Sequence, residues 1–206
     1  MRIFLTAFGL LALSIALPFT AHAAPPAAPT NLQLVGGIYT NDTSPTFLWD
    51  AVAGAVHYDY RMNDNNYIGV GSATTITLSG MRSGWHTFHL RAQDANGDSS
   101  TAASITFEID TIGPTVPALT PTTATALSSV TLKTTTTGEA WTASCRLTVD
   151  GVDVGAMHAS GQTFSRAYTF TTSGNHKAYA TCVDGDGNTT VGGTATIVVA
   201  ASAQAG

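Results

Sequence analysis

Charged side chains are scarce in this sequence, and the residues that usually supply a basic surface are almost missing. Charged residues make up 10% of the 206 residues, lysine occurs only as Lys133 and Lys177, and the formal net charge is −5. A phosphate backbone or an anionic membrane surface would meet no basic patch on such a protein. We therefore predict that it binds no nucleic acid.

Catalytic motifs are absent as well. The sequence has no G-x-S-x-G element for a serine nucleophile, and no H-E-x-x-H or clustered Cys and His for zinc. Glutamate occurs only at Glu108 and Glu139, and most aspartates lie in predicted turns, so a facing pair of carboxylates is not indicated. These absences predict a protein that is not an enzyme and carries no cofactor. The alternative is a small secreted enzyme or inhibitor whose site lies in the loops.

A long apolar run is found only at the start of the chain. Arg2 is followed by apolar residues from Ile3 to Leu17, and Ala21-His22-Ala23 has the small-x-small form that signal peptidase cuts after. The run is shorter than the ~20 residues of a membrane-spanning helix. We predict that 1–23 is a signal peptide and that the mature chain, with a net charge of −6 once Arg2 is lost, is secreted or periplasmic without inserting into a membrane.

The mature chain has the pattern of an all-β fold. No stretch keeps the i, i+3, i+4, i+7 spacing of an amphipathic helix, and short alternating segments are separated by Gly, Asn, Asp and Pro. The predicted strands are 32–34, 46–49, 56–62, 67–70, 74–78, 85–92, 104–109, 130–136, 143–149, 152–157, 163–170, 176–183 and 195–199. Alternation gives the first half an inward set of Phe47, Trp49, Tyr58, Tyr60, Met62, Ile76, Leu78, Phe88, Leu90, Ala92, Ile105, Phe107 and Ile109.

The two halves of the mature chain repeat one architecture. Residues 84–98 lie over 174–188 without a gap, with Gly, His, Asp and Gly at equivalent places, and a second match places Tyr60-Arg61-Met62 over Cys145-Arg146-Leu147. Seven short strands in about 85 residues is the count of one β-sandwich. We predict two sandwich domains, at 24–110 and 111–200, with a tail at 201–206. The prolines of the joint should stiffen it into an extended tandem.

Several short motifs resemble known modules. The first half resembles a fibronectin type III or bacterial Ig-like module through Trp49, Tyr58 and the segments 78–84 and 92–97. The second half resembles bacterial Ig-like repeats through 174–176 and 184–188, and the junction 107–114 is similar to joints between tandem repeats of bacterial surface proteins. The resemblance implies two tandem Ig-like (fibronectin III-like) β-sandwiches. Such modules serve as spacers, adhesins, assembly partners and accessory domains of secreted enzymes.

Cys145 and Cys182 are the only cysteines. In an oxidising compartment such a pair predicts one disulfide, and two buried free thiols are the alternative. The repeat places the cysteines on neighbouring strands with both side chains pointing into the core. The predicted bridge therefore lies within one sheet, unlike the bridge between sheets in antibody domains.

His86 and His176 occupy equivalent places in the two halves, and His is the common general base and metal ligand. Each shares a strand face with inward residues, at a strand entrance where Ig folds often place a Tyr that bonds to the preceding corner. A buried ring there needs a partner, which a backbone carbonyl would supply. We interpret both histidines as structural.

Asp184, Asp186 and Asn188 have the alternate spacing with which a calcium loop opens. The loop of the first half that starts at Asp94 keeps this spacing. However, Asp-Gly is also favoured in tight turns, and no downstream Glu completes a calcium loop. We favour the turn, with calcium as the alternative.

One candidate binding face remains. On the outward phase of two neighbouring strands lie His57, Asp59 and Arg61, opposite His89 and Arg91. In a charge-poor protein this set predicts a recognition face, although the ordinary alternative is a solvated sheet with cross-strand pairs.

The sequence therefore predicts a non-catalytic module for binding, adhesion or cell-envelope assembly, whose partner is a protein or glycan at the cell surface. Alternatives are a structural subunit that self-associates through exposed sheet edges, and an accessory or inhibitor protein of a secreted enzyme system.

Overall fold

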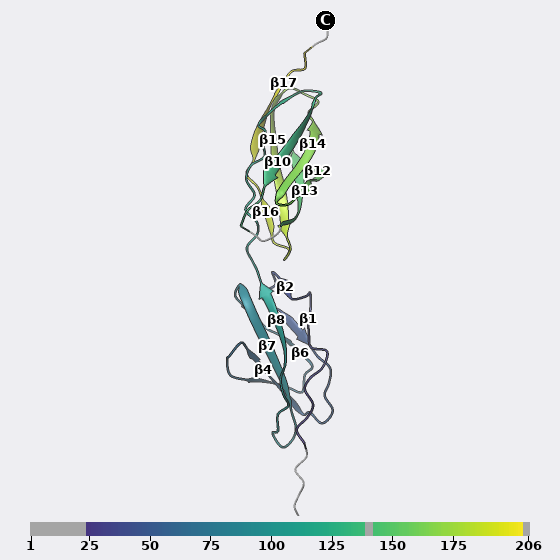
Figure 1. Ribbon diagram of the computed structural model, residues 1–206, viewed down its shortest axis with the longest axis vertical. Helices are drawn as coiled ribbons and strands as arrows, with labels where there is room; N and C mark the ends of the chain where they lie inside the picture. Colours follow the sequence, from purple (N-terminus) through teal and green to yellow (C-terminus); the bar gives the residue numbers. More distant parts are fainter. Residues whose placement is uncertain (1–23, 139–141, 204–206) are drawn as a thin grey trace, which may run out of the picture.

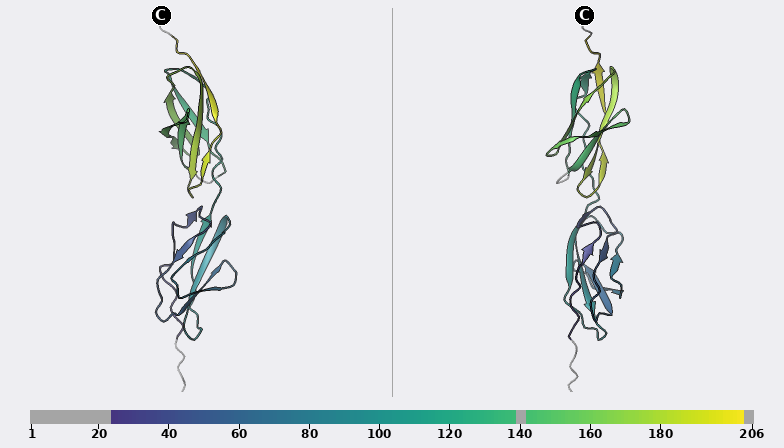
Figure 2. Two further views of the ribbon diagram at one scale, coloured as in Figure 1. Left: turned by 180° about the vertical axis from the view of Figure 1, so that it is seen from behind. Right: turned by 90° about the vertical axis from the view of Figure 1, so that its right-hand side faces the viewer.

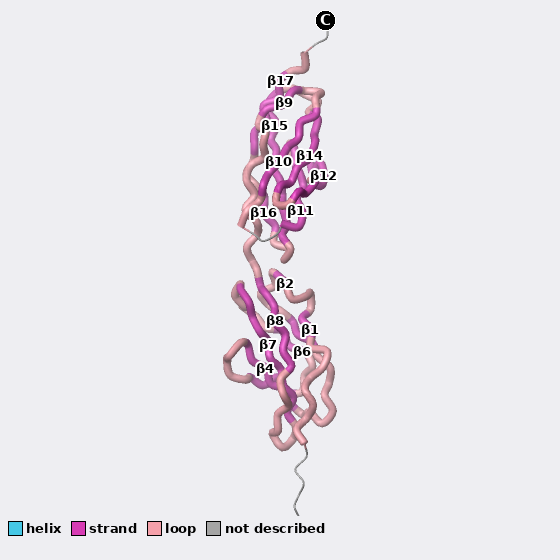
Figure 3. Tube along the Cα trace, in the orientation of Figure 1, coloured by secondary structure: helices cyan, strands magenta, loops and turns pink. Residues whose placement is uncertain are grey.

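The computed structural model describes residues 24–138 and 142–203, and the regular elements of these ranges are all β-strands (Figure 3). The predicted signal peptide, 1–23, and the last residues of the predicted tail lie outside the described residues. In the described ranges, no helix is long and apolar enough to cross a membrane.

The first module consists of strands β1 to β8. A three-stranded sheet in the order β1-β3-β6 packs against a five-stranded sheet in the order β2-β8-β7-β4-β5. Strand β2 pairs with β8 in parallel, and the other pairs are antiparallel. The bounds are β1 Gln33–Leu34, β2 Tyr39–Thr40, β3 Thr46–Leu48, β4 His57–Met62, β5 Ile68–Gly71, β6 Thr75–Thr77, β7 Gly84–Gln93 and β8 Ala103–Ile109.

An aromatic core joins these two sheets. The ring of Phe47 on β3 stacks on that of Phe88 on β7, with centroids 4.0 Å apart, and Phe107 of β8 meets Phe47 edge-on at 5.4 Å. All thirteen residues of the predicted inward set are either buried in this core or packed against it. Burial of such rings is the main source of stability for a small sandwich.

The second module consists of strands β9 to β17. A three-stranded sheet, β10-β14-β13, packs against a larger sheet, β12-β11-β15-β17-β9, in which β16 also pairs with β15. Here β9 pairs with β17 in parallel. The bounds are β9 Thr123–Thr125, β10 Ser129–Thr135, β11 Thr142–Val149, β12 Val152–Ala156, β13 His158–Ser160, β14 Thr163–Thr169, β15 Gly174–Asp184, β16 Thr189–Val191 and β17 Ala195–Ala200.

The thirteen predicted strands are all present, with bounds that differ by at most two residues. Strands β2, β9, β13 and β16 were not predicted. Each has only two or three residues, a length at which hydrophobic alternation gives only a weak signal.

The two modules lie end to end (Figures 1 and 2). Each has its own hydrophobic core, one running from Leu34 to Ile109 and the other from Val116 to Val199. The side-chain amide of Asn188, in the turn between β15 and β16, donates to the carbonyl oxygens of Asp110 and Ile112, at 2.9 and 3.3 Å. A turn of the second module thus holds the connecting segment directly.

Candidate functional site

Strands β4 and β7 bring the candidate binding residues together. Their register places Asp59 opposite Arg91 and Arg61 opposite His89, with His57 at the start of β4. Residues that are directly opposite in a sheet share a face, so the five side chains form one surface, which we call the β4–β7 face.

The centre of the β4–β7 face is a nearly buried carboxylate. Asp59 is only 8% exposed. Its Oδ2 accepts hydrogen bonds from Nε and Nη2 of Arg91, at 3.1 and 3.0 Å, and its Oδ1 lies 3.0 Å from Nε2 of His57. A carboxylate this far from water requires such partners. The face is therefore a connected network rather than a row of independently solvated side chains.

Tyr67 completes this network, and the sequence had not singled it out. The ring centroid of Tyr67 lies 4.0 Å from Cζ of Arg91 and 5.3 Å from Cζ of Arg61, within the range of cation–π attraction. Gly69, on the neighbouring edge strand β5, has no room for a side chain, because a Cβ there would lie 2.6 Å from Nε2 of His57. A glycine inside a predicted strand was the available sign of this close approach.

His89 carries less positive charge than the two arginines of the face. Burial lowers the pKa of His89, and the charge of Arg61 lowers it further. At neutral pH the positive charge of these two strands therefore comes from Arg61 and Arg91 rather than from His89.

The strand-entrance histidines have the predicted carbonyl partners. Nε2 of His86 lies 2.8 Å from the carbonyl oxygen of Arg82, and Nε2 of His176 lies 3.1 Å from that of Thr172. Both partners are four residues earlier in the chain. This geometry ties each ring to the corner before its strand, and the predicted carbonyl partner is confirmed for both histidines.

The two histidines differ in their second ring nitrogen. Nδ1 of His176 lies 2.6 Å from Oδ2 of Asp150, whereas Nδ1 of His86 is buried without a partner among the described residues. The hydrogen bond that the His176 ring donates to Asp150 raises the pKa of His176, and the same hydrogen bond, with one from the backbone N–H of Lys177, lowers the pKa of Asp150.

A side chain that closes the turn after β4 in the first module recurs after β11 in the second. In the second module, Oδ1 of Asp150 accepts the Lys177 backbone N–H at 2.8 Å, and the Asp150 N–H donates to the Lys177 carbonyl at 2.7 Å. In the first module, Asn63 makes the same two bonds with Thr87, at 2.8 and 2.7 Å. Both residues have a positive φ, 51° for Asn63 and 49° for Asp150, which Asn and Asp tolerate better than most residues.

This recurrence shows that the second predicted match was wrong by two residues. Cys145 pairs with Cys182, and the residue that pairs with the equivalent Ala92 is Tyr58, not Tyr60. A shift of two residues leaves every side chain on its original face, so hydrophobic alternation could not reveal the error.

The predicted disulfide between Cys145 and Cys182 is present within one sheet. The cysteines are directly opposite on β11 and β15, their Cα atoms are 4.1 Å apart, and both are fully buried. In the first module the same place is occupied by Tyr58, whose hydroxyl accepts the backbone N–H of Val52 at 2.7 Å.

The loop proposed as a calcium alternative has the contacts of a turn. Oδ1 of Asp184 accepts the backbone N–H groups of Asp186 and Asn188, at 3.0 and 2.8 Å, and its Oδ2 accepts the Asn188 amide at 3.0 Å. Burial, followed by the charge of Asp184, raises the pKa of Asp186. Across the described ranges, no group of three or more His, Cys, Asp or Glu side chains could hold a metal ion.

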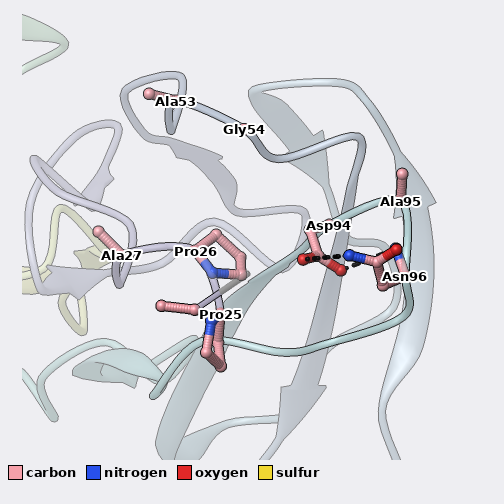
Figure 4. Close-up of a pocket in the computed structure, with 9 residues that line it drawn as sticks. Pro25, Pro26, Ala27, Ala53, Gly54, Asp94, Ala95 and Asn96 are labelled. Carbon is pink, nitrogen blue, oxygen red and sulfur yellow. Dashed lines mark hydrogen bonds between the residues drawn. The ribbon is translucent and has the colours of Figure 1, made fainter. Parts of the chain in front are cut away.

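The far end of the first module has an open pocket of about 420 Å³ (Figure 4). Asp94 supplies the one carboxylate of its lining, and the Asn96 backbone N–H donates to Asp94 Oδ1 at 2.9 Å. The other lining residues are small or apolar: Ala24, Pro25, Pro26, Ala27, Ala53, Gly54 and Ala95, with Asn96. The pocket offers no set of groups for acid–base or nucleophilic chemistry.

No family model and no curated protein matches this sequence. Among solved structures, the chain is similar to fibronectin(III)-like modules of Clostridium thermocellum CbhA. Identity is 14%, coverage is 82% of this chain and 94% of that one, and the TM-score is 0.50. It is also similar to the FN1–FN3 domains of chicken CNTN1, at 13% identity, 86% and 69% coverage and a TM-score of 0.46. At 14% identity, the similarity to the CbhA modules shows the fold alone: fibronectin III-like β-sandwiches in tandem.

Proposed function

We propose that this chain is an exported, non-catalytic binding protein that presents the β4–β7 face to a partner at the cell surface, in adhesion or cell-envelope assembly. The observation that carries the proposal is the network in which Asp59 and Tyr67 hold Arg61 and Arg91 in place. Side chains that are ordered before binding lose little entropy when a partner arrives.

The chemistry of the β4–β7 face favours an acidic partner group. The β4–β7 face presents two arginines, Arg91 held by the buried Asp59 and Arg61 with the fully exposed Asp64 3.8 Å away at its margin, in a protein whose overall charge is negative. The side chains of Arg61 and Arg91 are 27% and 30% exposed, so part of each remains accessible. Carboxylates of a protein or of an acidic glycan suit such guanidinium groups.

Two further observations support export and a non-catalytic role. The buried disulfide suits an oxidising compartment, in agreement with the predicted signal peptide. The histidines with the most suggestive positions are engaged in structural contacts. Sequencing the N-terminus of the protein isolated from culture medium or periplasm tests export, with Ala24 as the expected first residue.

The binding test uses substitutions that leave the buried carboxylate paired. Replacing His57 or Arg91 would remove a partner of Asp59 and endanger folding. The informative variant is therefore Arg61→Ser with His89→Ser, and Arg146→Ser, an arginine on the outward face of β11 in the second module, is the matched control. Labelled mature protein is titrated onto envelopes of the producing cells.

We expect the double variant to bind at least ten times more weakly than wild type and the control to bind normally. Equal binding of all three proteins would show that the β4–β7 face is not the binding surface. Equal weakening in the variant and the control would show that only the total charge matters.

A further inference from the structure

A second exposed surface lies on the same sheet, beside the joint between the modules. Strands β2, β8 and β7 are neighbours, and their register places Tyr39, Glu108 and Trp85 in one row. Phe107 and Ile109, which flank Glu108 in the chain, are fully buried, so the row lies on the outward face. We call it the Tyr39–Glu108–Trp85 row.

The two aromatic side chains of this row are unusually exposed. Tyr39 is 51% and Trp85 56% exposed, and in the described ranges they are the aromatic members of the set of exposed large hydrophobic residues. They also touch each other, with ring centroids 5.9 Å apart and an interplanar angle of 82°. Neighbouring strands lie about 4.8 Å apart, so the two rings lean toward each other across β8, above Glu108. Exposed aromatic pairs of this kind mark interaction sites.

The carboxylate between the rings is paired with no cation of the described residues. No hydrogen bond or ion pair joins the Glu108 side chain to any of them, and its backbone N–H donates to the carbonyl of Ile38 at 2.8 Å. Acidic groups lie within reach of its charge across the joint, because Glu108, after burial and the charges of Asp184 and Asp110, contributes to raising the pKa of Asp186. The surroundings of the row therefore attract positive charge.

We propose that the Tyr39–Glu108–Trp85 row docks an arginine or lysine side chain of a partner protein. The carboxylate supplies the counter-charge, and the electron-rich faces of Trp85 and Tyr39 supply cation–π attraction. This surface is separate from the β4–β7 face and has the opposite charge preference, so it stands whether or not the β4–β7 face binds an acidic group.

The ring geometry favours a cation over a neutral sugar. Rings that are 82° apart cannot both stack flat against the same face of one sugar ring. They can both border a compact cation placed beside the carboxylate. Each exposed cation–π contact contributes a factor of about two to five in affinity, and an exposed ion pair contributes a similar factor.

The experiment follows the indole N–H signal of Trp85 in two-dimensional NMR spectra of the intact mature protein. The probe is the blocked peptide Gly-Arg-Gly-Arg-Gly. The control is the same peptide with both arginines replaced by citrulline, which keeps the shape of arginine but is neutral. We expect saturable shifts of Trp85 and of the Tyr39 and Glu108 amides with the arginine peptide, and at least a fivefold weaker effect with the citrulline peptide.

Two variants and a control separate this site from general charge attraction. Glu108→Gln should weaken arginine-peptide binding about two- to fivefold and Trp85→Ala by a similar factor, monitored on the Tyr39 amide. Asp64→Asn removes one negative charge from a fully exposed side chain of the same module and should leave the affinity unchanged. The proposal is overturned if Glu108→Gln binds as wild type, if it is no weaker than Asp64→Asn, or if the citrulline peptide binds equally. Shifts of Trp85 with maltohexaose and none with the arginine peptide would instead assign the row to glycans.

Discussion

The pair formed by His176 and Asp150 allows the effect of one charge on stability to be predicted. The first module contains a natural control for the pair, because Asn63 takes the place of Asp150 there. Asp150→Asn should keep the turn closed, since Asn63 makes the same two backbone hydrogen bonds in the first module. The substitution removes only the carboxylate that faces Nδ1 of His176. Any loss of stability therefore reports the charge of the pair.

The sign and the pH window follow from the directions of the two pKa shifts. The pKa of His176 is raised above its ordinary 6.5, so its contribution is complete below pH 6.5 and decreases as the pH rises through the folded-state value. The pKa of Asp150 is lowered below 3.8, so its contribution is complete above pH 3.8 and is lost as the pH falls through the folded-state value. Wild type and Asp150→Asn should differ most between pH 3.8 and 6.5.

The magnitude is limited by solvent. The side chain of Asp150 is 49% exposed and that of His176 is 15% exposed. A charge-assisted hydrogen bond is worth about 1.5–3 kcal/mol when well shielded, and exposed ion pairs contribute about 0.2–1 kcal/mol. We expect Asp150→Asn to lower the free energy of unfolding of the second module by about 1 kcal/mol at pH 5, and by less at pH 8.

Hydrogen exchange of the intact protein, resolved by peptide, measures the free energy of unfolding of each module separately. The reciprocal variant, Asn63→Asp, should stabilise the first module in the same pH window, because it puts a carboxylate at the position equivalent to Asp150 in the module where Nδ1 of His86 has no partner among the described residues. The reasoning would be refuted if the free energy of unfolding of the second module changed with pH in the same way in wild type and Asp150→Asn. An unchanged pKa of His176, measured by NMR in that variant, would refute it as well.

Three other predictions concern the disulfide, the joint and the β4–β7 face. Reduction should lower the free energy of unfolding of the second module by about 4 kcal/mol, because the disulfide closes a loop of 37 residues. Melting curves with and without reductant measure this loss, and a melting point that does not change with reductant would contradict it. Asn188→Ala should loosen the joint, which small-angle scattering would detect as a broader distribution of module distances, and an unchanged distribution would show that other contacts hold the joint. Gly69→Ala should displace the ring of His57 from Asp59 at a cost of about 1 kcal/mol or less, and unaltered ring signals of His57 would show that the edge strand moves instead.

Hydrophobic alternation was sufficient to predict the sheets and the core. Apolar residues at every second position, such as Phe88 and Leu90 on β7, must face the core, so the residues between them face outward. This alternation predicted both the buried set and the cross-strand pairs of the β4–β7 face. The contact between the His86 ring and a backbone carbonyl of the preceding corner was predicted because a buried ring nitrogen needs a hydrogen-bond partner. Similarity to fibronectin III-like structures supports the predicted fold.

Features that depend on contacts between distant segments were not predicted. Alternation carries no information on a register shift of two residues, so it could not decide whether Tyr58 or Tyr60 matches Cys145. The role of Tyr67 depends on the contact of its ring with Arg91, a residue far away in the sequence. The pairing of Asp150 with His176 joins residues 26 positions apart, and no local pattern marks such a pair.

The parallel terminal strands determine how the second module would respond to a pulling force. Strand β9, near the entrance of the module, lies beside β17, near its exit, and the two pair in parallel from Thr123 to Thr125 and from Val198 to Ala200. Tension between the two ends of the module would pull these strands in opposite directions along their length. Their hydrogen bonds would then be loaded together, in shear, rather than opened one at a time. The disulfide would also keep the 37-residue loop from extending, which shortens the fully stretched module by roughly 120 Å. The same covalent bond that stabilises the fold at rest would therefore limit its extension under load.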